Sequence, residues 1–425
     1  MNIFDQLLAD NQIPKFVRVR HEMDRGHIDD IEGAVAQAMQ REDTLDRIKP
    51  GDSVCITAGS RDVANIARII RAICDQVKSV GAHPFIIPAM GSHAGAKAEG
   101  QRGIIEGYGV TEEAMGAPIR ASMDTEVIAH SKSGLEIHLD KFANAADFLI
   151  PVGRIKAHTD FRGEVESGIC KMLVIGMGKQ HGAYQCHKLG FKSMAANVKE
   201  FAGAIIEKKP NMFAIGLIEN AYHQTCRIEA IPAGRILEEE PPLLEYAKSR
   251  MAKVPFDQAD ILFVDETGKD ISGAGMDPNV TGRSPVLGIS RPFFQRIAVF
   301  DLTDKSHGNF GGLGSADVTT QRLYRKIDFE QTYPNGITAA EPLAVRLPAV
   351  MPSDRTAMQF ALRTATDCDW SKGPRIVWLK NTLSLSEFYI SEALIPDAEA
   401  LDNVTVVSEP MDVIFDEEGN VKELR

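Results

Sequence analysis

A strand–helix–strand pattern early in the chain restricts its possible folds more than any other feature. Residues 53–57 and 84–88 are short apolar runs rich in β-branched residues and bounded by turn-forming Pro and Gly. Between them, apolar residues recur at helical spacing over 63–80, with Ser60 as the expected N-cap and Gly81 after the last turn. Such a unit crosses over with a right hand, which makes its two strands parallel. The pattern predicts an α/β protein with a Rossmann-like parallel sheet.

Polar, glycine-containing loops follow both of these strands. Ala58-Gly59-Ser60-Arg61-Asp62 comes after the first strand, and Gly91-Ser92-His93-Ala94-Gly95-Ala96 comes after the second. Ligands of open parallel sheets bind at the carboxyl ends of the strands. We therefore expect Arg61 and His93 to lie at one edge of the sheet.

The rest of the chain predicts a second α/β domain. A hairpin is expected to turn at 131–134, a buried strand covers 148–152, and helices cover 192–208 and 241–252. A new series of strands then begins at 261–265 and continues at 297–300 and 376–379. We predict a catalytic and cofactor-binding domain over 1–254, a capping domain over 255–425, and an active-site cleft between them.

Two further stretches carry expectations about local structure. Gly311-Gly312-Leu313-Gly314-Ser315 is expected to precede a helix that starts near Asp317, either as a plain turn or as an anion-binding loop. Glu238, Glu239 and Glu240 form an acidic run that we expect to lie on a solvated face.

Composition excludes several classes of protein. The formal net charge of −12 disfavours nucleic acid and anionic membranes as partners, and no stretch approaches the ~20 apolar residues of a membrane span. The six cysteines are scattered without a CxxC pair, so neither a disulfide framework nor a Cys-type zinc site is indicated. The first residues show no secretory signal. We expect a cytoplasmic enzyme whose partner is a small molecule. Its oligomeric state is not indicated.

Residues suited to proton transfer and metal binding are concentrated in polar loops. Histidine is the side chain that titrates nearest neutral pH and is the commonest metal ligand. The candidates, all in or beside loops that follow predicted strands, are Arg61, His93, His158, Arg162, Lys171, Lys179, His181 and His187.

Three motifs together resemble the lactate racemase family of nickel-pincer-nucleotide isomerases. They are GSHAGA at 91–96, KAHTDFRG at 156–163 and ESGICKMLVIGMGKQHGA at 166–183, and the resemblance is strongest over 50–190. In that family two loop histidines act as proton acceptor and donor. A lysine is joined covalently to the pincer nucleotide, and a histidine sixteen residues later is a nickel ligand.

The resemblance implies a role for each matching residue. His93 and His158 correspond to the acid/base pair, and Arg61 lies in a loop similar to the one that orients the substrate. Lys171 and His187 are sixteen residues apart, so they correspond to the attachment lysine and the metal ligand, whereas Lys179 does not fit that spacing.

Two departures from the family pattern suggest a substrate other than lactate. Ala58 stands where the racemases carry an aspartate. The run before Lys171 is Glu-Ser-Gly-Ile-Cys rather than one containing Gly-Gly-Arg, and Lys171 follows His158 by thirteen residues, a longer interval. We therefore expect a racemase or epimerase of another 2-hydroxy acid or of a sugar acid.

Lys269 completes the set of candidate site residues. It lies in the polar, glycine-rich loop 266–283 after a buried strand of the second domain. Loops at strand ends often carry function, and a lysine there could meet a substrate carboxylate or a cofactor phosphate.

Two other functions remain open from the sequence. A metal-dependent hydrolase could use His93, His158, His181 and His187 to bind zinc and activate water, although an HExxH helix is missing. A non-catalytic protein could bind a small ligand between two α/β domains.

Overall fold

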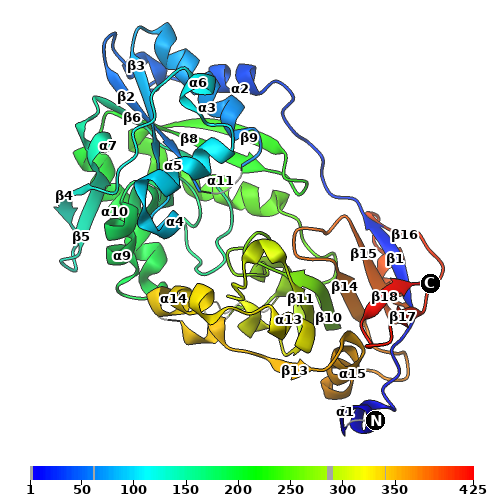
Figure 1. The fold of residues 1–425 in the computed structure, drawn as a ribbon. Coiled ribbons are helices and arrows are strands. Elements are labelled where there is room, and N and C mark those ends of the chain that lie inside the picture. The colour runs from blue at the N-terminus through cyan, green and yellow to red at the C-terminus, as the bar shows by residue number, and fades with distance from the viewer. Residues whose placement is uncertain (1–2, 61–62, 285–290, 340) are drawn as a thin grey trace. The chain divides into compact units, whose positions relative to one another are not determined.

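The computed structural model describes residues 3–60, 63–284, 291–339 and 341–425 (Figure 1). The chain forms two compact units, which we call the N-terminal unit (residues 24–251) and the C-terminal unit (residues 252–425 together with 1–23). Strand β1 (Phe16–His21) belongs to the C-terminal unit, because it pairs with two strands of that unit, although residues 1–254 were predicted as one domain.

The N-terminal unit is built on parallel strands, as the sequence predicts. Strands β3, β2 and β6 form one parallel sheet, β7 and β8 pair in parallel, and β9 pairs antiparallel with β8. The hairpin β4–β5 stands apart from these sheets. The strands are β2 (Ser53–Ala58), β3 (His83–Pro88), β4 (Thr125–His130), β5 (Glu136–Asp140), β6 (Phe148–Ile150), β7 (Val152–Arg154), β8 (Phe213–Glu219) and β9 (Thr225–Pro232).

Helices cover both faces of these strands. Neighbouring residues of a strand point to opposite faces, so Val54 and Ile56 enter one hydrophobic core and Cys55 enters the other. Apolar residues of α2 and α3 line the first core, and those of α10 and α11 line the second. The helices are α2 (Ile31–Ala38), α3 (Ile66–Ser79), α4 (His93–Ala96), α5 (Ala98–Gly107), α6 (Glu112–Met115), α7 (Lys141–Ala145), α8 (Ile169–Lys171), α9 (Lys179–His187), α10 (Phe191–Lys208) and α11 (Ile236–Arg250).

Two details of this unit differ from the sequence-based expectation. Helix α3 starts at Ile66, after Asn65 in the left-handed conformation, rather than near Ser60. The strand expected over 148–152 is two strands, β6 and β7, which separate at Pro151 and pair in different sheets. Proline has no N–H to donate to a ladder, so it permits this change of partner.

The C-terminal unit contains a mixed eight-stranded sheet in the order β13-β12-β11-β10-β14-β15-β1-β16. Its first five strands are parallel and the last three add antiparallel. Besides β1, the strands are β10 (Gln258–Thr267), β11 (Phe293–Leu302), β12 (Val318–Thr320), β13 (Ala349–Met351), β14 (Ile376–Leu379), β15 (Glu387–Ser391) and β16 (Val404–Val406), with a separate hairpin of β17 (Val413–Phe415) and β18 (Val421–Leu424). The predicted α/β fold class is confirmed.

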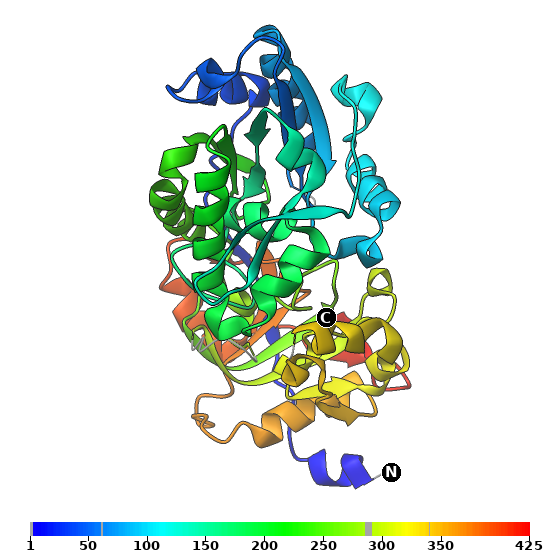
Figure 2. The same cartoon turned by 90° about the vertical axis from the view of Figure 1, so that its left-hand side faces the viewer.

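Helices and aromatic packing complete this unit. Trp378 of β14 packs with Phe16, Phe263 and Phe300 on one face of the sheet. Helix α1 contacts α15, and Figure 2 shows it below that helix, next to the N-terminus. The helices are α1 (Ile3–Leu8), α12 (Pro278–Thr281), α13 (Gln321–Arg325), α14 (Phe329–Ala339), α15 (Asp354–Thr364) and α16 (Ile395–Glu399). The prediction of a helix that starts near Asp317 is wrong, because strand β12 begins at Val318.

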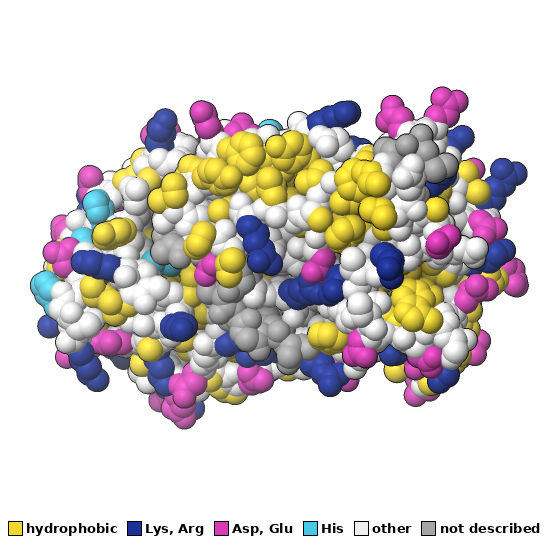
Figure 3. All heavy atoms as spheres, turned by 90° about the horizontal axis from the view of Figure 1, so that it is seen from below, with side chains coloured by type: hydrophobic (Ala, Val, Ile, Leu, Met, Phe, Trp, Pro, Cys, Tyr) yellow, Lys and Arg dark blue, Asp and Glu magenta, His cyan; other side chains and the backbone are white. Residues whose placement is uncertain are grey.

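The surface carries apolar patches between charged side chains of both signs (Figure 3). On α14, Phe329, Tyr333 and Ile337 are exposed, and their spacing of four residues places them on one side of the helix. Within the described ranges, no helix has the length and apolar character needed to cross a membrane. The six cysteines are free thiols.

Candidate active site

The loop after β3 carries His93 to the carboxyl edge of the parallel sheet. Gly91 has a φ of +58°, and a Cβ at this position would meet Ile175 at 3.2 Å, so the loop packs too closely for a side chain. His93 is exposed, and its Nδ1 lies 2.5 Å from the carbonyl oxygen of Met90. Because a carbonyl only accepts, Nδ1 carries the hydrogen of the neutral ring. The proton-accepting nitrogen of His93 is therefore Nε2.

The segment after β7 folds back on itself and brings His158 to Lys171. The backbone groups of Lys156 and Ser167 bond to each other in both directions, at 3.0 and 3.2 Å. This pairing closes a loop between them, and Lys171 Nζ then lies 2.6 Å from His158 Nε2. The loop therefore accommodates the thirteen-residue interval between His158 and Lys171.

The hydrogen bonds of His158 define its tautomer and hold its partner, Lys171. The backbone N–H of Asp160 donates to His158 Nδ1 at 2.9 Å, so the hydrogen of the neutral ring is on Nε2. Burial lowers the pKa of His158 well below its ordinary value, which keeps the ring neutral. Nε2 of this ring is the atom in contact with Lys171 Nζ, so the histidine holds the lysine amine in place.

An irregular helix connects Lys171 to His187. Lys171 is the last residue of α8, and residues 172–176 form a π-helical turn in which the N–H of Met177 bonds five residues back, at 2.9 Å. Helix α9 follows and ends at His187. Single π-helical turns are rare and frequent at functional sites.

His187 is held in the tautomer that suits a metal ligand. Its Nδ1 lies 2.6 Å from the carbonyl oxygen of Ala183, so Nδ1 carries the hydrogen and Nε2 presents a lone pair. Burial lowers the pKa of His187, and charges on Lys171 and Asp160 also act on that pKa, which places both residues within electrostatic reach. His158, Lys171 and His187 therefore form one cluster.

Lys179 is in a different environment from Lys171. Its side chain is fully buried, and Nζ forms an ion pair with Asp140 at 3.2 Å and donates to the carbonyl oxygen of Pro88. Burial lowers the pKa of Lys179. Its amine is committed to contacts inside the N-terminal unit.

Three other candidates have different surroundings or lie outside the described residues. Arg61 lies outside the described residues. Lys269 follows β10 in the C-terminal unit, where its Nζ donates to the carbonyl oxygen of Gly273 at 2.6 Å. His181 stacks on His138, with 5.6 Å between ring centres.

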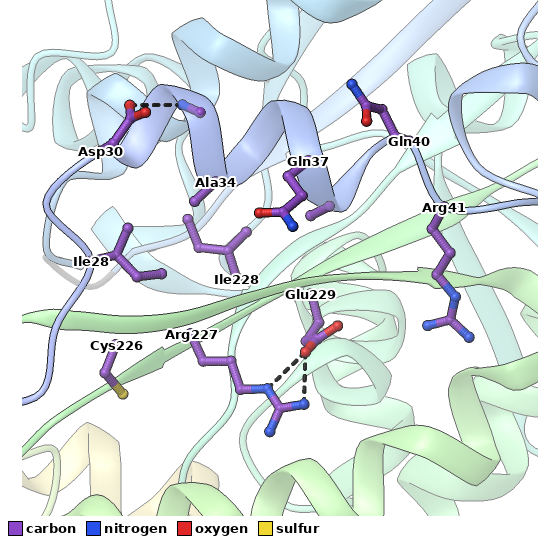
Figure 4. A pocket seen from close by; sticks show the side chains of 12 residues that line it. Ile28, Asp30, Ala34, Gln37, Gln40, Arg41, Cys226, Arg227, Ile228 and Glu229 are labelled. Carbon is purple, nitrogen blue, oxygen red and sulfur yellow. Dashed lines mark hydrogen bonds and ion pairs between the residues drawn. The ribbon is translucent and has the colours of Figure 1, made fainter.

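A cavity of the N-terminal unit is formed by other residues. It has a volume of about 910 Å³ and lies between helix α2 and strand β9, lined among others by Gln37, Arg41, Arg227 and Glu229 (Figure 4). Arg227 and Glu229 form an ion pair at 2.7 Å. Among the described site candidates, none lines this cavity or the second one, of about 450 Å³, beside Lys208 and Lys209.

Comparison with protein families gives a match to the early part of the chain. Residues 6–198 match the lactate racemase N-terminal domain. The predicted resemblance is confirmed, and the match includes His93, His158, Lys171 and His187. The chain is also similar to the solved structure of the lactate racemase apoprotein from Thermoanaerobacterium thermosaccharolyticum, with 16% identity, a TM-score of 0.53, and coverage of 86% of this chain and 93% of that one. That likeness establishes a shared fold. No curated protein sequence matches this chain.

Two buried carboxylates that contact the backbone of this cluster were not found by the sequence analysis. Glu166 accepts the backbone N–H of His158 at 2.7 Å, and Glu240 accepts that of Cys170 at 2.9 Å. The expectation that Glu240 is solvated is wrong, because its side chain is fully buried, and burial raises its pKa. A helical projection of 236–250 could have found it, since Glu240 lies on the same side as the buried Leu243, Leu244 and Ala247.

Proposed function

We propose that this protein is a racemase or epimerase of a 2-hydroxy acid or sugar acid that works with a nickel-pincer nucleotide. The observation that carries the proposal is the contact of 2.6 Å between Lys171 Nζ and His158 Nε2, with His187 in the same cluster. The match to the lactate racemase N-terminal domain supports this class of reaction.

The described residues fit the cofactor that the family implies. Lys171 offers an amine, held against His158, for a covalent bond, and His187 offers the Nε2 lone pair that a metal requires. Lys179 is buried in an ion pair with Asp140, which favours Lys171 as the attachment residue. When bound, the cofactor would accept the hydrogen of the substrate carbon as hydride and return it.

The chain itself would move the hydroxyl proton and orient the substrate. His93 presents Nε2 as a base, and His158 carries its hydrogen on Nε2 as an acid, so the two rings are in complementary states. One ring on each side of a planar carbonyl compound would allow the reaction to run in both directions. Arg61 would bind the substrate carboxylate, ideally through two hydrogen bonds.

We assign Lys269 a supporting role in the same reaction. Its loop follows β10 at the carboxyl end of a parallel strand, where α/β sheets bind ligands. A lysine there would meet the substrate carboxylate or the cofactor phosphate, and the C-terminal unit would exclude water during the hydride step.

The hydrolase alternative receives less support from the geometry. In the described part of the chain, no three His, Cys, Asp or Glu side chains are grouped so that they could hold a metal ion. His181, which that alternative needs, stacks on His138 instead. A metal held within a nucleotide cofactor needs only one histidine from the chain, and His187 meets that need.

Intact mass spectrometry tests the attachment, with protein purified from a host that makes the cofactor. We expect a nucleotide adduct on the wild type, its loss in Lys171→Ala, and its retention in Lys188→Ala, which removes an exposed lysine near the same helix. An adduct that persists in Lys171→Ala would refute the assignment. An equimolar zinc content without a nucleotide would favour the hydrolase, and ligand binding without turnover would favour a binding protein.

Racemisation in D₂O tests the chemistry. A hydride that leaves and returns keeps the substrate's own hydrogen, so we expect inversion of 2-hydroxy acids without deuterium at the reacting carbon. Deuterium at that carbon would instead indicate proton abstraction. Changing His93 or His158 to Asn should lower kcat by ~10²–10⁴-fold.

A further inference from the structure

Helix α11 lies beyond the segment that matches the lactate racemase N-terminal domain, yet its side chains contact the segment that carries His158 and Lys171. The match ends at residue 198, and α11 covers Ile236–Arg250. It packs against β8 and β9 (Figure 1) and against α8, the short helix that ends at Lys171. Two of its side chains, Glu240 and Lys248, reach the segment that carries His158 and Lys171.

Glu240 holds the start of α8. Its Oε2 accepts the N–H of Cys170, the residue before Lys171, at 2.9 Å. This bond satisfies one of the N–H groups that the first turn of a helix leaves unpaired. A Cβ on Gly168 would collide with Oε1 of Glu240, so the glycine is what lets the carboxylate approach the backbone this closely.

Lys248 acts on the other end of the segment through Glu166. Its Nζ lies 3.0 Å from Oε1 of Glu166, a side chain that is fully buried. The other oxygen of Glu166 accepts the backbone N–H of His158 at 2.7 Å. One helix therefore anchors both partners of the contact between His158 and Lys171.

A purely structural role does not account for a carboxylate at position 240. Removing a carboxylate from water costs free energy that a hydrogen bond recovers only in part, and apolar side chains of similar volume are often at least as stable in such places. What the Glu240 side chain provides is reach: its carboxylate accepts the N–H of Cys170 while helix α11 stays packed in the core.

We propose that Glu240 is a positioning residue that fixes Lys171 against His158, with Lys248 and Glu166 fixing the histidine end. This inference rests on the proposed function for the meaning of Lys171. The geometric part, a hydrogen bond from Glu240 that sets the contact between Lys171 and His158, holds for the protein without cofactor.

Three substitutions separate position from charge. Glu240→Ala removes the hydrogen bond. Glu240→Asp keeps the charge but withdraws the carboxylate by about one bond length, so it no longer reaches Cys170 N–H. Glu240→Gln keeps the length and an accepting oxygen. Glu238→Ala is the matched control, because Glu238 lies on the same helix and is 74% exposed.

Two readouts are measured on each variant. The first is the ¹⁵N shift of the His158 ring in histidine-labelled protein without cofactor, assigned from its absence in His158→Asn. The second is the fraction of chains with a covalent nucleotide after expression in a host that makes the cofactor. Displacement of a reacting group by about 1 Å lowers a rate by up to ~10²-fold, so we expect a loaded fraction about tenfold lower in Glu240→Ala and Glu240→Asp, with a shifted His158 signal. Glu240→Gln and Glu238→Ala should resemble the wild type.

The outcomes distinguish this inference from the proposed function. A wild type that never carries an adduct contradicts the proposed function, while the His158 signals still test the position of the lysine. Wild-type loading and unshifted signals in Glu240→Asp refute the positioning role, as does Glu240→Gln behaving like Glu240→Ala. If Glu240→Ala does not fold, the comparison of Glu240→Asp with Glu240→Gln tests the positioning role.

Discussion

Breaking the buried pair of Lys179 and Asp140 should destabilise the N-terminal unit strongly. Both side chains are fully buried, with 3.2 Å between Lys179 Nζ and Asp140 Oδ2. Asp140 also caps α7, because its Oδ1 accepts the N–H groups of Phe142 and Ala143 at 2.8 and 3.1 Å. Lys179→Met leaves the carboxylate unpaired, whereas Asp140→Asn leaves the ammonium unpaired and keeps the cap.

The magnitude follows from the cost of an uncompensated buried charge. Removing one partner of such a pair costs about 3–5 kcal/mol, so each single variant should lose that much stability. The double variant Lys179→Met with Asp140→Asn leaves neither charge and should lose less than the sum of the singles by about 2–3 kcal/mol. Because burial lowers the pKa of Lys179, the loss in Asp140→Asn should shrink as the pH rises and the lysine gives up its proton.

Urea unfolding followed by circular dichroism measures these values, on the two single variants and the double. Additive losses would show that the two charges do not depend on each other and would refute the reasoning. The covalent adduct provides a second check. If Lys179→Met is folded under the assay conditions, we expect it to carry the nucleotide still, because the Lys179 amine that it lacks is buried and Lys171 is the proposed attachment residue.

Three further predictions concern the C-terminal unit. Burial raises the pKa of Asp265 to about 7, although the hydrogen bond from Trp378 lowers it. The folded state therefore binds the proton more tightly than the unfolded state, and the stability falls as the pH rises from about 4 to 7. Asp265→Asn should remove that fall in urea titrations and add up to roughly 4 kcal/mol above pH 7. Ser353 caps α15 through Thr356, and Ser353→Ala should cost about 1 kcal/mol in thermal unfolding. Lys269→Ala should raise the KM of the substrate about tenfold without changing the adduct, as loss of one charged hydrogen bond implies; an unchanged KM would remove Lys269 from the site.

Strands with a strong local signal could be predicted from the sequence. Residues 376–379 are a strand with the predicted bounds, and β2 and β3 form the expected parallel pair. In these segments β-branched residues and turn signals agree with the burial that the fold imposes. At Pro151 the local pattern is equally apolar on both sides, so the change of sheet depends on pairing with β8, which is more than sixty residues away.

The candidate site could be predicted in its residue types but not in its contacts. The motifs indicated His158, Lys171 and His187, and the structure brings these three together. The roles of Glu166 and Glu240 could not be read from the motifs, because an acidic side chain is usually solvated and only tertiary packing reveals a buried one. The tautomers likewise depend on carbonyl and N–H groups that the fold supplies.

The backbone pairing of Lys156 with Ser167 has a consequence for how the site can evolve. The base of this loop is fixed by its own backbone hydrogen bonds, so the loop can change in length without breaking that pairing. Doubling a flexible loop costs only about 0.6 kcal/mol of closure entropy. Its exposed tip is tied to the site as well, because Arg162 donates to the carbonyl oxygen of His158 and pairs with Glu166 at 3.3 Å. A change of length between His158 and Lys171 is therefore compatible with the site only where the contacts of Arg162 are kept or replaced.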